Sequence, residues 1–171
     1  MNVLKGNKGM TLLELIVVVT VLGVMLTVGG PNLMNWLEKG RQREAAYELA
    51  SVIRLARAQA LELGNRTGIK ISIGGETDID GDGGFEDYIL FVDSDSNLDY
   101  TMGEQVIIDK EWGRGASIDA STDGIGDITR LIYKPSGLIE VNPNGNDTTI
   151  TIDDYQVTIS NITGRVMVDE N

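Results

Sequence analysis

Oxygen-bearing side chains in one acidic loop have the spacing of a calcium site. Oxygen groups stand at positions 1, 3, 5, 7, 9 and 12 of the segment 93–104, contributed by Asp93, Asp95, Asn97, Asp99, Thr101 and Glu104. Calcium takes carboxylate and carbonyl oxygens at this spacing. Position 6, however, is Leu98, where the turn usually needs glycine, and both flanks have the composition of strands. A solvated, metal-free loop between two strands is therefore the alternative reading.

A second acidic loop, residues 78–87, carries the first half of the same pattern. Its carboxylates at positions 1, 3 and 5 are Asp78, Asp80 and Asp82, but position 12 is Ile89. The glycines between these carboxylates favour a flexible hairpin tip. The two loops flank the expected strand Tyr88–Val92, so we expect them at its opposite ends and not around one shared ion.

The composition excludes most other active-site chemistry. The 171 residues contain no cysteine and no histidine, which removes thiol chemistry, the commonest general base and the usual zinc ligand. There are 26 acidic residues against 14 basic ones, a net charge of -12. Such a charge does not attract nucleic acid or anionic lipid. We therefore expect neither an enzyme nor a nucleic-acid-binding protein.

An uncharged apolar run near the N-terminus is the element that must position the rest of the chain. No residue from Leu15 to Leu37 is charged, and about 20 apolar residues are enough to cross a bilayer. Glu14 stands at the start of this run, behind the basic residues Lys5 and Lys8. A carboxylate at the edge of an apolar layer is costly unless it has a partner. A plain signal peptide or membrane anchor does not explain Glu14.

The residues around this glutamate resemble the class III leader of type IV pilins and pseudopilins. The matching segment reads Lys8-Gly9-Met10-Thr11-Leu12-Leu13-Glu14-Leu15. The resemblance implies that a prepilin peptidase cuts between Gly9 and Met10, methylates the new amine of Met10 and leaves the apolar run attached. Met10 departs from the phenylalanine that is usual there. Pro31 would become residue 22 of the mature chain, where the family commonly has a helix-kinking proline.

The same resemblance gives Glu14 a role in assembly. Glu14 would be the fifth residue of the mature chain, and the family's proposed partner for it is the methylated N-terminal amine of a neighbouring subunit. Opposite charges in a low-dielectric filament core fix the register of packing more than they add stability. The alternative is a Glu14 that reaches the membrane interface or is protonated.

The hydrophobic pattern predicts an α+β fold. Apolar residues recur at spacings of three and four up to Leu63, so one helix is expected from about Thr11 to Leu63, with Gly64 as its stop. Its first half would lie in the membrane and its amphipathic second half would pack on a C-terminal antiparallel β-sheet domain. The expected strands are 68–73, 88–92, 105–110, 130–134, 138–141, 148–152, 156–160 and 165–168. The expected organisation is a leader at 1–9, a membrane or filament-core helix at 10–34, an amphipathic stem at 35–65 and an extracytoplasmic β-rich domain at 66–171.

Short segments within this pattern are similar to the GspH/FimT group of pilin-like proteins. They are Leu55–Ala60, Phe91–Asp95 followed by Gly103-Glu104, Lys134–Gly137 and Gly164–Val166. GspH-type proteins are minor pseudopilins of type II secretion, and FimT-type proteins are minor pilins of type IV pili, some of which bind DNA. DNA binding would call for a second basic residue near Met167, which this chain lacks.

The resemblance implies a structural subunit that spans the inner membrane once before assembly, with its β domain on the periplasmic side. Its partners would be a prepilin peptidase and other pilins or pseudopilins of a filament. The leading interpretation is a GspH-type minor pseudopilin of a type II secretion pseudopilus. A FimT-type minor pilin, with or without a link to DNA uptake, is the alternative. A third reading is a membrane-anchored calcium-dependent binding domain unrelated to filaments.

Overall fold

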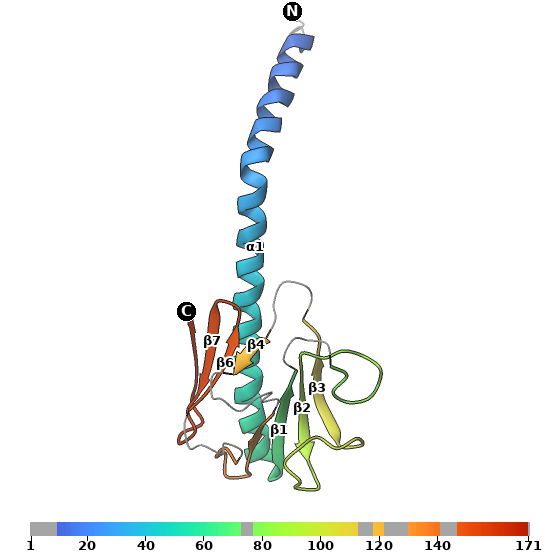
Figure 1. Ribbon diagram of the computed structural model, residues 1–171, viewed down its shortest axis with the longest axis vertical. Helices are drawn as coiled ribbons and strands as arrows, with labels where there is room; N and C mark the ends of the chain where they lie inside the picture. Colours follow the sequence, from blue (N-terminus) through green and yellow to red (C-terminus); the bar gives the residue numbers. More distant parts are fainter. Residues whose placement is uncertain (1–9, 73–76, 113–117, 122–129, 141–146, 171) are drawn as a thin grey trace, which may run out of the picture. The chain divides into compact units, whose positions relative to one another are not determined.

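The computed structural model describes residues 10–72, 77–112, 118–121, 130–140 and 147–170, without the side chains of residues 28–32 and 118–121. Within these ranges the chain forms one helix and eight strands, whose order along the chain is visible in Figure 1. The chain divides into an N-terminal unit, Met1–Leu37, and a C-terminal unit, Glu38–Asn171. The leader residues 1–9, including Gly9, lie outside the described part.

Helix α1 runs from Leu12 to Leu63, with caps at both ends. The backbone N–H of Glu14 donates to Thr11 Oγ1 at 3.2 Å, so Thr11 is the N-cap and Glu14 stands three residues into the helix. At the other end, Gly64 adopts a positive φ of 66° and its N–H donates to the Ala60 carbonyl at 3.2 Å. Both predicted helix ends are confirmed.

The N-terminal part of α1 has apolar side chains on all its faces. Every described large apolar side chain from Leu12 to Leu26 is exposed, so no single stripe of the helix is covered. Thr20 Oγ1 donates to the Ile16 carbonyl at 2.7 Å, and Thr27 Oγ1 donates to the Gly23 carbonyl at 2.7 Å. Both hydroxyls are therefore satisfied by the helix itself and suit apolar surroundings.

A membrane span was predicted for this region. Among the residues whose structure is described, no helix combines the length and the apolar character needed to cross a membrane. The backbone stays helical through positions 29–31, where the sequence predicted a kink or break, and the side chain of Pro31 lies outside the described part.

The C-terminal unit contains two four-stranded antiparallel sheets. The first has the order β3-β2-β1-β5 and the second the order β4-β6-β7-β8. The strands of the first sheet are β1 (Arg66–Ile71), β2 (Tyr88–Asp93), β3 (Gln105–Lys110) and β5 (Arg130–Tyr133). Those of the second are β4 (Ile118–Ser121), β6 (Thr148–Ile152), β7 (Tyr155–Ile159) and β8 (Val166–Glu170).

The core of the C-terminal unit forms where both sheets pack on the second half of α1 (Figure 1). The helix contributes Ala45, Ala46, Leu49, Ala50, Val52, Ile53, Ala56 and Ala60, all buried. These side chains belong to one hydrophobic cluster with buried side chains from both sheets. Among them, Leu49 and Ile53 are completely buried, and burying a side chain of this size stabilises the fold by about 2 kcal/mol.

The strand predictions are mostly confirmed, with three differences. Residues 138–140 make only an isolated bridge between Tyr133 and Ile139, so the strand predicted at 138–141 is wrong within its described part. Strand β4 was not predicted, since Ile118–Ser121 is short and pairs with β6, some 30 residues further along the chain. The strands also form two sheets, a division that depends on pairings between distant segments.

Packing of the stem helix can be tested with the same substitution at two positions of α1. Leu49→Ala removes a completely buried side chain, whereas Leu55→Ala removes one that is 37% exposed. We expect Leu49→Ala to lower the thermal midpoint of the full chain in detergent by roughly 5–15 °C. Leu55→Ala should lower it by less than about 3 °C. Equal effects measured by circular dichroism would mean that α1 does not pack on the sheets through this face.

Candidate functional site

The acidic loop 93–104 connects β2 to β3 and begins at a buried carboxylate. Asp93 is the last residue of β2 and is only 2% exposed. Its Oδ2 accepts a hydrogen bond from the Leu98 N–H at 3.3 Å, whereas its Oδ1 has no hydrogen-bond partner within the described part of the chain. Burial raises the pKa of the Asp93 carboxyl; the Leu98 N–H lowers it, and the charge of Glu104 raises it further.

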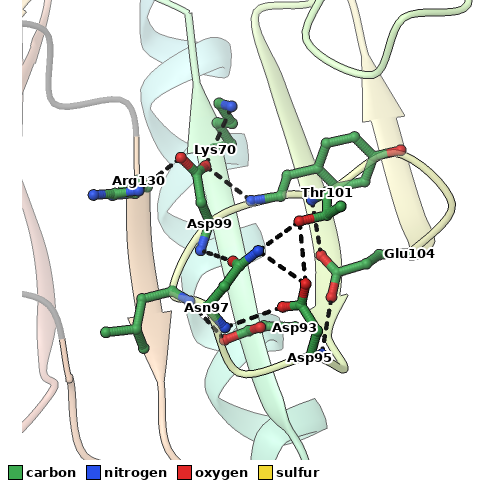
Figure 2. Close-up of polar contacts among 10 residues, drawn as sticks. Lys70, Asp93, Asp95, Asn97, Asp99, Thr101, Glu104 and Arg130 are labelled. Carbon is green, nitrogen blue, oxygen red and sulfur yellow. Dashed lines mark hydrogen bonds and ion pairs between the residues drawn. The ribbon is translucent and has the colours of Figure 1, made fainter.

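Two further carboxylates point toward Asp93. One oxygen each from Asp93, Asp95 and Glu104 lies within 4.8 Å of the others, and Figure 2 shows the three side chains converging inside the loop. Backbone hydrogen bonds hold Glu104 in this position: its Oε1 accepts from the Ser94 N–H at 2.6 Å and its Oε2 from the Thr101 N–H at 3.0 Å. Glu104 therefore ties the end of the loop back to its beginning.

Asn97 and Thr101 join the same group. Asn97 Nδ2 donates to Asp95 Oδ2 at 2.9 Å and to Thr101 Oγ1 at 2.6 Å, and Thr101 Oγ1 lies 3.3 Å from Asp95 Oδ2. The structure thus brings together five of the six side chains that the calcium spacing selected: Asp93, Asp95, Asn97, Thr101 and Glu104.

Asp99 is the exception, because its side chain turns out of the loop toward two cations (Figure 2). Its carboxylate lies 3.2 Å from Lys70 Nζ and 2.7 Å from Arg130 Nη1, which come from β1 and β5. Burial works to raise the pKa of Asp99, but the Tyr100 N–H and these two cations outweigh it, and the pKa is lowered. The carboxylate of Asp99 serves to fasten the loop to the first sheet.

The loop adopts the turn that its sequence was not expected to allow. Leu98, at the position where glycine is usual, has a φ of +69°, and Ser96 has a φ of +62°. A non-glycine residue in this region carries strain, which persists only where surrounding contacts hold it. One such contact is the hydrogen bond from Arg66 Nη1 to Ser96 Oγ at 2.8 Å.

The second acidic loop, between β1 and β2, forms its own cluster. Asp78, Asp80, Asp82 and Glu86 each offer an oxygen within 4.8 Å of the others. Glu86, only 3% exposed, stands at position 9 of this loop and was not among the carboxylates that the sequence selected there. Backbone N–H groups partner the cluster: Gly81 N donates to Asp78 Oδ1 at 2.7 Å and Ile79 N donates to Glu86 Oε2 at 2.7 Å. These backbone hydrogen bonds account for the positions of the carboxylates without a bound ion.

The two loops lie closer together than the sequence predicted. Gly81 has a φ of +85°, and a Cβ placed on it would come within 2.6 Å of Met102 Cε, so a loop tip at one end of β2 touches the loop at the other. The carboxylates nevertheless form two separate groups, as expected. The positive φ favours glycine at position 81, whereas the end of the exposed Met102 side chain could move away from a larger residue.

At the N-terminus, Glu14 has a local role in addition to any role in assembly. Thr11 and Glu14 have the spacing of a capping box. The Thr11 side chain accepts a hydrogen bond from a backbone N–H of the first turn, and the negative charge of Glu14 is stabilised by the positive end of the helix dipole. The N-terminal amine that the leader motif predicts would belong to Met10, next to the cap; Met10 is 62% exposed. The predicted processing at Gly9 and Met10 and the predicted pairing of Glu14 stay predictions.

The long capped helix with its second half buried on antiparallel strands, preceded by this N-terminal motif, is the architecture of a pilin-like subunit. The prokaryotic N-terminal methylation motif matches residues 4–30. The family described as type II transport protein GspH matches residues 45–164, and the chain belongs to this family. It is a minor pilin or pseudopilin of the type IV pilin-like family, and therefore a structural subunit and not an enzyme.

Three known proteins are similar to this chain to different degrees. The pilin-like protein PilA1 of Thermus thermophilus is 30% identical over 136 residues, covering 77% of this chain and 79% of that protein. The minor pseudopilin EpsH from the type 2 secretion system of Vibrio cholerae is 14% identical with a TM-score of 0.49, covering 76% of this chain and 97% of that one. The type IV minor pilin FimU of Pseudomonas aeruginosa is 14% identical with a TM-score of 0.46, covering 74% and 91%.

Proposed function

We propose that this chain is a GspH-type minor pseudopilin that joins the pseudopilus of a type II secretion system. The observation that supports this most is the match of the GspH family to residues 45–164, which include the buried stripe of α1 and the seven strands β1 to β7. In this proposal the segment 10–34 holds the subunit in the inner membrane before assembly. The β domain then lies on the periplasmic side.

Assembly through the N-terminal part of α1 follows from its surface. Its described large apolar side chains from Leu12 to Leu26 are exposed, and the hydroxyls of Thr20 and Thr27 are satisfied internally. Such a helix loses little when it leaves lipid for a bundle of similar helices, because both surroundings are apolar. Glu14 is the charged side chain at the start of this surface, so its pairing with the Met10 amine of a neighbour would set the register between subunits.

A minor pilin of a type IV pilus is the second candidate, favoured by the similarity to a pilin-like protein over most of both chains. A role in DNA uptake receives less support from the charge. The chain would carry -14 once Lys5 and Lys8 are removed, whereas phosphate contacts come mainly from lysine and arginine. Membership of the pilin-like family argues against the third reading, a calcium-dependent domain unrelated to filaments.

Deletion of the gene distinguishes the two machines. The proposal predicts that extracellular enzymes accumulate inside the deletion strain, whereas surface pili, twitching and DNA uptake stay at wild-type levels. Complementation with the full-length gene should restore secretion. Normal secretion with loss of pili or of transformation would assign the chain to the pilus instead.

Substitution of Glu14 separates its charge from its helix-capping role. Glu14→Leu removes both, whereas Glu14→Gln keeps a hydrogen-bonding side chain at the capping-box position and removes only the charge. If charge pairing fixes the register, both variants should insert in the membrane normally and should be recovered in filaments at least about tenfold less than the wild type, as one lost charge pair allows. Quantitative immunoblotting of sheared filaments against total membranes measures this ratio. Normal incorporation of Glu14→Gln would show that the pairing is not required.

A further inference from the structure

We propose that the β2–β3 loop is a calcium site, with Asp93, Asp95 and Glu104 as its carboxylate ligands and the Thr101 hydroxyl beside them. Asn97 would join through its Oδ1 once its amide turns over, because its Nδ2 now faces Asp95 and Thr101. The ligands would come from positions 1, 3, 5, 9 and 12 of the segment 93–104, and the ion would sit where their side chains converge in Figure 2.

The first support is the buried, unpartnered oxygen of Asp93. Asp93 is 98% buried, and within the described residues its Oδ1 has no hydrogen-bond partner. A buried carboxylate oxygen without a partner is costly, and such groups in folded proteins usually have a hydrogen bond, a water or an ion. Because one oxygen each of Asp93, Asp95 and Glu104 lies within 4.8 Å of the others, a cation held between the three carboxylates would give Asp93 the partner that it lacks.

The second support is the charge balance around the loop. The nearby basic side chains are engaged elsewhere: Lys70 and Arg130 pair with Asp99, and Arg66 pairs with Glu140 at 2.5 Å. In the described part of the chain, no lysine or arginine forms an ion pair with Asp93, Asp95 or Glu104. Three carboxylates therefore face one another with no direct ion pair and only the more distant charge of Arg66 acting on Asp93, an arrangement that a divalent cation stabilises.

The position of Asp99 fits this site as well. In calcium loops, position 7 contributes its backbone carbonyl and not its side chain. Asp99 is at position 7, and its carboxylate is turned away to Lys70 and Arg130, which leaves the backbone as its contribution. The turn at position 6, where Leu98 has a φ of +69°, is already formed.

The chemistry of the ligands selects calcium over other common metals. The three carboxylates and the Thr101 hydroxyl offer oxygens, and the chain has no histidine or cysteine to favour zinc or copper. Three carboxylates, an amide and a hydroxyl on a loop of irregular shape suit the flexible, high coordination number of calcium. Magnesium demands near-octahedral geometry and keeps several of its waters.

The neighbouring acidic loop provides a matched control. It gathers four carboxylates where the proposed site has three. Within the described residues, however, none of its side-chain atoms is both buried and without a hydrogen-bond partner. We therefore assign no ion to Asp78, Asp80, Asp82 and Glu86. Asp80→Asn removes one charge there, just as Asp95→Asn does in the proposed site.

Calcium binding is tested by calorimetry and thermal unfolding of the full chain in detergent, with calcium added up to about 5 mM, a range that covers weak extracellular sites. At saturation we expect the thermal midpoint to rise by about 5 °C and to return on addition of EGTA. Asp95→Asn and Glu104→Gln should each weaken binding at least tenfold, about the effect of losing one strong ligand. Asp80→Asn should bind as the wild type does, and magnesium at the same concentration should give a smaller shift.

Three outcomes would overturn the proposal. The first is the absence of both heat and a thermal shift with calcium in the wild type. The second is an equal shift in the wild type and in both Asp95→Asn and Glu104→Gln, which would place the ion elsewhere. The third is loss of binding in Asp80→Asn alone, which would assign calcium to the neighbouring loop.

Discussion

The burial of one stripe of α1 between two sheets is the interaction on which the rest of the C-terminal unit depends. The two sheets share no strand, and the core that joins them passes through the helix, from Ala45 to Ala60. The stripe combines small alanines with the fully buried Leu49 and Ile53, which belong to the same hydrophobic cluster as side chains of both sheets. Both acidic loops are carried by the first sheet, so their geometry also rests on this packing.

The same helix has different surroundings along its length. Its stem buries one face, as expected of an amphipathic helix on a domain, whereas the described large apolar side chains from Leu12 to Leu26 are exposed. A surface of this kind is a place for other molecules, and membership of the pilin-like family identifies them as other pilin-like subunits. Function in this chain therefore lies in assembly, and the absence of histidine and cysteine is consistent with that role.

Features that depend on residues close together in the sequence could be predicted, whereas features that depend on contacts between distant segments could not. Thr11 and Gly64 marked the helix ends because capping depends on residues three or four positions away. Most strands followed from alternation. The pairing of β4 with β6 could not be predicted, because it joins segments far apart. Likewise, the spacing placed Asp99 among the ligands, but Lys70 and Arg130 from two other strands draw its carboxylate away.

We infer that the apolar N-terminal helix is kept in the mature protein as the assembly element of a pilin-like subunit. The most direct measurement is the mass and sequence of the N-terminal peptide of the protein recovered from its native membranes. We expect a chain that begins at Met10, with one methyl group on its amine and Glu14 as its fifth residue. An N-terminus at Met1, or one located behind the apolar run, would contradict it.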